Sequence, residues 1–177
     1  GLEASTASLV TVAEPDGLCL RDGYAALVAS LEASNADLVV GVAESISGHR
    51  RRIDRSIDGA LSDSAQNIVL SERPGLIADD LLCTKVVRRE LLQAAVSEVE
   101  PWHEGLIVAR LLTSAARIDV VARSMYFCRH HGSKRVTKVL SPEWIAEHRL
   151  TGVAVARGAA AVRECHARTV LTREMLS

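Results

Sequence analysis

The chain has 177 residues, of which 48% are hydrophobic, so it is long and apolar enough to form one globular domain with a sizeable core. Its 21 basic and 22 acidic residues nearly cancel, and the formal net charge is -1. This balance excludes the overall electrostatic attraction to nucleic acids or membrane surfaces that strongly basic proteins show. A partner must therefore be bound by a local site.

The sequence contains no apolar run of the roughly 18 residues that a membrane helix needs, and its start, GLEASTASL, lacks the features of a signal peptide. We therefore predict a cytoplasmic protein without a transmembrane segment, with the inner face of the membrane as a further location to consider. The cysteines are scattered singly, without the spacing of metal ligands, and we interpret them as reduced, mostly packed thiols. They are Cys19, Cys83, Cys128 and Cys165.

The first predicted strand, over residues 9–13, ends in two acids, Glu14 and Asp16. The residues that alternate with them, Pro15 and Gly17, already favour a turn, so the acids are not needed to reverse the chain. Two carboxylates two positions apart at a strand tip have the chemistry that binds a hard divalent cation such as Mg²⁺ or Mn²⁺. The stretch is either a solvated turn or such a cation site.

A helix is predicted over residues 22–34, where apolar side chains recur at helical spacing, and a buried strand over residues 38–43. A strand, a helix and a strand in this order predict a parallel α/β unit. Residues 45–73 are polar and contain the run HRRRIDRSID, which is typical of an exposed insertion or hairpin.

The remaining pattern continues the alternation of helices and strands. After a turn at Asp79 and Asp80, the stretch TKVVRRELLQAA becomes a helix, and the next helix is predicted over residues 103–117. Strands are predicted at residues 118–122 and 125–128.

Helices are predicted from Ser141 and Pro142 to the last residue, because Ser before Pro with an acid in the first turn is typical of a helix start. Their apolar positions are interrupted by arginines, which indicates an amphipathic surface that packs on the domain or on a neighbouring domain. We therefore divide the chain into an α/β domain at 1–140 and a C-terminal helical extension at 141–177.

The order of these pieces resembles the catalytic domain of family 2 glycosyltransferases, which have the GT-A fold, and especially the bacterial members that build wall or capsule polymers. In chain order, the motifs that carry the resemblance are Glu14 with Asp16, DLVVG at 37–41, KVVRR at 85–89, Trp102 with Glu104, and YFCR at 126–129. The match spans about residues 4–138. It implies a mixed sheet with flanking helices, without the family's N-terminal half that binds the nucleotide, and so implies further domains of a longer chain.

The resemblance also implies a function, namely the transfer of a sugar from a nucleotide-sugar donor to a glycan or polymer acceptor, with inversion at the sugar. Asp16 and Glu14 would be ligands of Mg²⁺ or Mn²⁺, with Asp16 at the more usual ligand position. The acceptor hydroxyl needs a catalytic base, and the match leaves Glu104 for this role, with His103 beside it.

A second set of residues would contact the diphosphate and the substrate. By resemblance, the basic loop after the last strand would bind the diphosphate, because its charge must be balanced as it leaves. Trp102 would be either a platform for a sugar or a packing residue. The set is Trp102, Arg129, His131, Lys134 and Arg135.

Gly105 is the main departure from the family pattern, because the family has an acid at this position. Glycine cannot accept a proton, and a positioned base is worth roughly 10²- to 10⁴-fold in rate. Two other functions therefore stay open. One is a catalytically degenerate GT-A-like scaffold or acceptor-binding module, and the other is an unrelated α/β binding domain.

Overall fold

The computed structural model of the chain describes residues 1–13, 17–47, 50–53, 59–97 and 104–129. The predicted C-terminal helical extension, residues 141–177, lies outside this part of the chain. None of the helices within it combines the length and the apolar character that crossing a membrane requires.

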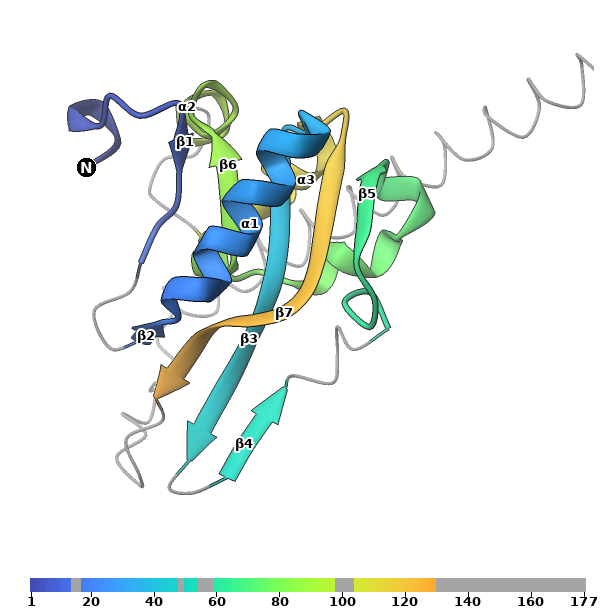
Figure 1. The fold of residues 1–177 in the computed structure, drawn as a ribbon. Coiled ribbons are helices and arrows are strands. Elements are labelled where there is room, and N and C mark those ends of the chain that lie inside the picture. Colours follow the sequence, from blue (N-terminus) through green and yellow to red (C-terminus); the bar gives the residue numbers. More distant parts are fainter. Residues whose placement is uncertain (14–16, 48–49, 54–58, 98–103, 130–177) are drawn as a thin grey trace, which may run out of the picture.

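Two long strands, β3 (Leu38–Ser47) and β7 (Ile118–Arg129), pair in parallel at the centre of the sheet (Figure 1). Within the described residues the sheet has seven strands, in the order β1-β6-β3-β7-β2. Two further strands lie off this path, with β4 paired to β3 and β5 paired to β7. The shorter strands are β1 (Leu9–Val10), β2 (Gly17–Cys19), β4 (Arg50–Ile53), β5 (Ala65–Ile68) and β6 (Lys85–Arg88).

The strand directions determine which loops share one end of the sheet. β1 is antiparallel to β6, β6 is antiparallel to β3, and β3 is parallel to β7. β1, β3 and β7 therefore point the same way. β6 begins opposite Val40, and beyond this level β3 and β7 continue to Ser47 and Arg129. We call the ends of β3 and β7 the carboxyl end of the sheet.

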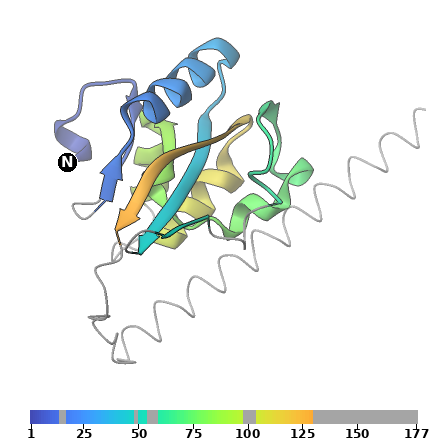
Figure 2. The ribbon, with the colours of Figure 1, turned by 60° about the horizontal axis from the view of Figure 1, so that its bottom comes forward.

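Helices cover both faces of the sheet, which Figure 2 shows with α1 (Arg21–Ser34) on one side and α3 (Glu104–Ser114) on the other. α2 (Arg89–Ser97) packs beside α3. The alternation of side chains along β3 explains this layering, because successive residues of a strand point to opposite faces. Leu38 and Val40 belong to the core on the α3 side, whereas Val39 and Ala43 belong to the core on the α1 side. The described connections contain the 3-10 helices η1 (Leu2–Ala4), η2 (Leu70–Glu72), η3 (Pro74–Ala78) and η4 (Leu82–Thr84).

The pairing of β3 and β7 is interrupted at mid-strand by an irregularity. β7 advances six residues, from Val120 to Tyr126, while β3 advances three, from Val40 to Ala43. The start of α1 packs against this point, and there a Cβ on Gly23 would lie 2.5 Å from the Met125 Cα. The extra residues of β7 and the missing side chain of Gly23 therefore let the helix approach the strand closely.

A buried carboxylate, Asp119, joins α1 and β5 to β7. Its Oδ2 accepts hydrogen bonds from the hydroxyls of Ser30 (2.6 Å) and Ser34 (2.8 Å), and its Oδ1 accepts one from the Asn67 N–H (2.9 Å). Because the Asp119 side chain is fully buried, these three donors supply the polar partners that water would otherwise provide.

Several sequence predictions are confirmed. The helix predicted over residues 22–34 is α1, and the strand over residues 38–43 is the first part of β3. In the polar segment, β3 and β4 form a hairpin. The two strands predicted at residues 118–122 and 125–128 are one strand, β7, and the predicted break coincides with its irregularity.

The predicted unit of first strand, helix and second strand is parallel, but its two strands are not neighbours in the sheet. β1 pairs with β6 and not with β3, whose parallel partner is β7. A local strand-helix-strand pattern cannot show that a later strand will insert between the first two, and β6 does so here. The stretch TKVVRRELLQAA also differs, because its first part forms β6 and only the rest forms α2.

We predict that Gly23→Ala destabilises the protein. Alanine favours a helix by about 1 kcal/mol over glycine, but the new Cβ would meet the Met125 backbone, and overpacking of this kind costs about 1–3 kcal/mol. The measurement is the free energy of unfolding from urea denaturation. Ala29→Gly, at an exposed position of the same helix, is the matched control and should lose only the propensity term. A Gly23→Ala protein more stable than the wild type would contradict the close packing of α1 on β7.

Candidate functional site

The acidic loop predicted as a metal site connects β1 to β2. Glu14 and Asp16 themselves lie outside the described residues, but Gly17, the first residue of β2, is placed. Gly17 pairs with Cys128, one residue before Arg129, where β7 ends. The backbone on one side of the acidic loop is therefore paired with the strand end from which the predicted basic loop continues.

Glu104 lies at the start of α3, where a carboxylate suits the positive end of the helix dipole. Its Oε1 accepts a hydrogen bond from the Leu82 N–H at 2.6 Å. Leu82 begins η4, which leads directly into β6. This bond places Glu104 next to the start of β6.

A buried ion pair lies in the turn between Asp79 and Lys85. Lys85 is 0% exposed and Asp79 is 2% exposed, and the Lys85 Nζ lies 2.8 Å from the Asp79 Oδ2. The Nζ also donates to the Leu81 carbonyl (2.6 Å) and to the Thr84 hydroxyl (3.1 Å). Each charge is thus paired and hydrogen-bonded, which is the condition under which a buried charge is tolerated.

Tyr24 of α1 contacts this turn from the other face of the sheet. Its hydroxyl donates to the Cys83 carbonyl at 2.7 Å. Burial raises the pKa of the Tyr24 hydroxyl well above its usual range, and Cys19 and Cys83 raise it further, whereas Thr11 lowers it. The hydroxyl therefore stays protonated and remains a donor at neutral pH. Thr11 and Cys19, which interact with Tyr24, flank the acidic loop in sequence.

Of the predicted site residues, the structure describes Glu104 fully and Arg129 by its backbone. Glu104 contacts η4, which precedes β6, and Arg129 ends β7. The other predicted site residues lie outside the described part of the chain, and their roles stay predictions. These are Glu14, Asp16, Trp102, His103, His131, Lys134 and Arg135.

No three His, Cys, Asp or Glu side chains within the described ranges are arranged to hold a metal ion. Glu14 and Asp16, the carboxylates predicted as metal ligands, lie outside the described residues, so this finding does not apply to them. Of the cysteines, Cys83 is buried as predicted, whereas Cys19 is exposed, and neither forms a disulfide.

Sequence reasoning did not identify Asp79, Lys85 or Tyr24 as part of this region. A signal was present, because LIADDLLCTKVV places a lone lysine in a mostly apolar run, where it is expected to be buried and paired with an acid. Arg88 of the KVVRR motif also has a structural role. It donates to the Ala36 carbonyl (2.9 Å) and the Asn35 side chain (2.5 Å), after the last turn of α1.

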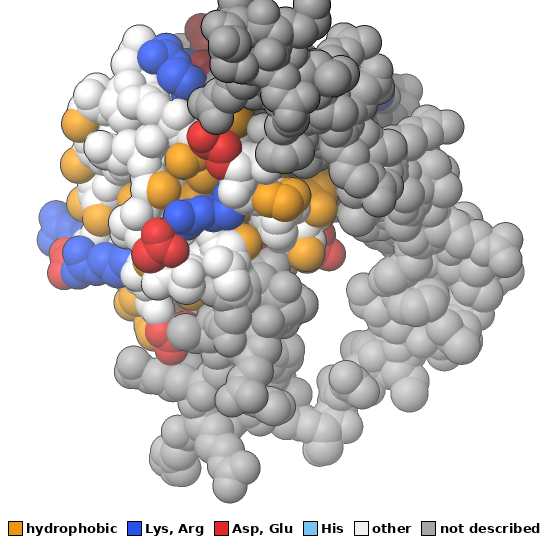
Figure 3. All heavy atoms as spheres, turned by 90° about the vertical axis from the view of Figure 1, so that its right-hand side faces the viewer, with side chains coloured by type: hydrophobic (Ala, Val, Ile, Leu, Met, Phe, Trp, Pro, Cys, Tyr) orange, Lys and Arg blue, Asp and Glu red, His pale blue; other side chains and the backbone are white. Residues whose placement is uncertain are grey.

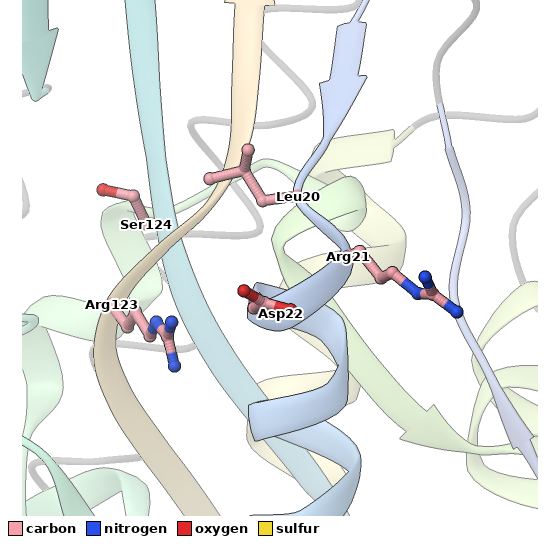
Figure 4. Close-up of a pocket in the computed structure, with 6 residues that line it drawn as sticks. Leu20, Arg21, Asp22, Arg123 and Ser124 are labelled. Carbon is pink, nitrogen blue, oxygen red and sulfur yellow. The ribbon is translucent and has the colours of Figure 1, made fainter.

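A small open pocket of about 190 Å³ lies beside the first turn of α1 (Figure 4). Asp22 and Arg123 point toward each other across it, whereas Arg21 points away. The remaining lining residues are Leu20, Gly23 and Ser124. Its size and its mixed charge do not indicate a particular ligand.

The face that carries β5 and the 3-10 helices η2 and η3 shows no patch of a single charge (Figure 3). Acidic and basic side chains are interspersed there with apolar ones in the described part. Arg73 and Asp63 form an ion pair of 2.9 Å on the protein surface. This distribution agrees with the balanced charge of the sequence.

No protein-family model matches the sequence, and no curated protein matches it. Solved structures with a similar fold include S. aureus TarS, a glycosyltransferase. TarS 1–349 in complex with UDP-GlcNAc has a TM-score of 0.67 and 16% identity, over 92% of this chain and 49% of TarS. TarS 1–349 in complex with UDP has a TM-score of 0.65 and 17% identity, over 92% of this chain and 47% of TarS. A further structure of TarS 1–349 has a TM-score of 0.61 and 18% identity, over 86% of this chain and 42% of TarS.

The chain therefore has a glycosyltransferase fold and spans less than half the length of the TarS chains that it matches. The predicted mixed sheet with flanking helices is confirmed. With identities below 20%, the similarity establishes the fold alone, and membership of family 2 stays a prediction.

We predict that Glu104→Ala lowers the free energy of unfolding by about 1.5–3 kcal/mol, the usual contribution of a hydrogen bond to a charged group. The substitution removes the acceptor of the Leu82 N–H. Glu90→Ala is the matched control, because Glu90 is an exposed acid in the first turn of α2. Glu90→Ala should lower the free energy of unfolding by about 0.3–1 kcal/mol, the helix-dipole contribution. Equal losses in urea denaturation would show that the bond to Leu82 adds nothing.

Proposed function

We propose that the chain is part of a glycosyltransferase that transfers a sugar from a uridine-diphosphate donor to a glycan acceptor. The observation that carries the proposal is that the acidic and basic loops both adjoin the pairing of β2 with β7, where Gly17 lies opposite Cys128. The acidic loop follows β1, Glu104 bonds to the segment that begins β6, and the basic loop follows β7. Support comes from the fold shared with TarS, whose crystal structures include complexes with UDP and UDP-GlcNAc.

Asp16 and Glu14 would hold Mg²⁺ or Mn²⁺, because their carboxylate oxygens are the hard ligands that these ions prefer. When bound, the ion would neutralise charge on the diphosphate. Arg129, His131, Lys134 and Arg135 would bind the diphosphate with charged donors, which stabilise the leaving group as it gains negative charge. Trp102 would support a sugar ring.

Glu104, with His103 beside it, would accept the proton of the attacking acceptor hydroxyl. A carboxylate is suited to this role when it is ionised and fixed in place, and the Leu82 N–H fixes one oxygen of Glu104. Direct attack by the acceptor hydroxyl would invert the configuration at the sugar carbon. The acceptor would be a wall or capsule polymer, modified in the cytoplasm or at the inner face of the membrane.

A second candidate is a catalytically degenerate protein that keeps the fold and binds the donor or the acceptor without turnover. Gly105 favours this alternative, because the resemblance places an acid at this position. Donor binding without sugar transfer would distinguish this candidate from the enzyme.

We predict that the protein binds UDP in a Mn²⁺-dependent manner and that Asp16→Ala abolishes this binding, because Asp16 would supply a ligand of the ion. The measurement is calorimetric titration of UDP, with and without Mn²⁺, into the 177-residue chain and into the natural protein if that is longer. Asp63→Ala, at an exposed acid on the protein surface, should leave the affinity unchanged.

Two outcomes would contradict the proposal. If no protein form binds UDP with Mn²⁺, the acidic loop is a turn and the fold serves another function. If Asp16→Ala binds as tightly as the wild type, the metal site lies elsewhere. If the protein does bind UDP with Mn²⁺, release of UDP from UDP-GlcNAc in the presence of a polymer acceptor would distinguish the enzyme from the degenerate alternative.

A further inference from the structure

The buried ion pair and Glu104 bind opposite sides of the same peptide unit. The Leu81 carbonyl accepts hydrogen bonds from the Lys85 Nζ (2.6 Å) and from the Thr84 hydroxyl (2.8 Å). The N–H of that peptide, which belongs to Leu82, donates to the Glu104 carboxylate (2.6 Å). A cation on the carbonyl side and an anion on the N–H side therefore act on one planar group.

This arrangement has two physical consequences. The peptide is planar, and its C=O and N–H point in opposite directions, so fixing the carbonyl also fixes the direction of the N–H. A cation at the carbonyl oxygen polarises the peptide and makes its N–H a stronger donor, as in other chains of hydrogen bonds. Lys85 thus fixes the position of the Glu104 carboxylate without touching it.

Asp79 holds Lys85 in this place. Its Oδ2 pairs with the Lys85 Nζ at 2.8 Å and accepts a bond from the Thr84 hydroxyl at 3.2 Å. Its Oδ1 accepts a bond from the Leu81 N–H at 3.3 Å. Because Asp79 and Lys85 are almost fully buried, water does not compete with these bonds.

We infer that Lys85 and Asp79 are positioning residues for Glu104, acting through the Leu81–Leu82 peptide. The structural part of this inference stands on the described contacts. Its catalytic consequence rests on the proposed function, in which Glu104 is the base. If that function holds, loss of the ion pair should lower kcat and leave the KM for the donor unchanged, because neither residue binds the nucleotide.

The test replaces the pair by apolar residues of similar size, Asp79→Leu with Lys85→Met, since a buried ion pair can often be exchanged in this way without loss of stability. The matched control is Asp63→Leu with Arg73→Met. In that pair too the cation binds a carboxylate and backbone carbonyls, here those of Ala60 and Asp63. The first readout is the Leu82 amide proton in the ¹⁵N-labelled chain, by its NMR shift and its exchange rate.

The inference predicts that the Asp79/Lys85 variant moves the Leu82 amide signal upfield and speeds its exchange, while the Asp63/Arg73 variant changes neither. Turnover of UDP-GlcNAc should fall at least about tenfold in kcat, since a well-placed base is worth roughly 10²- to 10⁴-fold. A folded Asp79/Lys85 variant with an unchanged Leu82 amide would overturn the inference, because the pair would then only stabilise the turn.

A second measurement changes Glu104, which is less buried than the ion pair, and leaves Asp79 and Lys85 in place. Glu104→Gln removes the negative charge at the Leu82 N–H and keeps the size of the side chain. If the peptide transmits the interaction, the carbonyl ¹³C signal of Leu81 and the ¹⁵N signal of the Lys85 ammonium should both shift. Unchanged signals would overturn the inference. A wild-type protein that does not turn over UDP-GlcNAc would contradict the proposed function alone, because both NMR readouts are independent of activity.

Discussion

The parallel pairing of β3 with β7 is the constraint on which the rest of the structure depends. β3 also pairs with β6 and β4, and β7 also pairs with β2 and β5, so nearly every described strand is attached to one of the two. Their alternating side chains supply a core on each face, one beneath α1 and one beneath α3. Because the two strands run in the same direction, their carboxyl ends meet, and the segments that follow emerge at one end of the sheet.

The turn that leads into β6 contains a buried electrostatic framework. The turn from Asp79 to Lys85 contacts α1 through Tyr24, α3 through Glu104, and continues into β6. A buried ion pair contributes little net stability compared with apolar packing, but it specifies geometry where its partners must be oriented. In this turn it orients the peptide that binds Glu104. The fold is shared with S. aureus TarS.

Much of the fold could be predicted from the sequence, because periodicity reports which side of an element is buried. The helix at residues 22–34 and the strand at residues 38–43 follow from spacing alone, and both are present. The interruption of β7 was visible as a gap between two predicted strands. The candidate site was predicted less completely. Glu104 was identified by resemblance, whereas the partners that fix it, Leu82 and Lys85, are about twenty residues away in sequence. The local pattern indicates that Lys85 is buried, but it does not show which residues Lys85 orients.

The sequence by itself determined the balanced charge, the alternation of strands and helices, and the position of the acidic loop after the first strand. These properties depend on neighbours within a few residues. Only the tertiary structure decided that β6 lies between β1 and β3, that Lys85 is fully buried against Asp79, and that Glu104 binds the Leu82 N–H. Strand partners and burial depend on contacts between distant segments, and these exist only once the chain has folded.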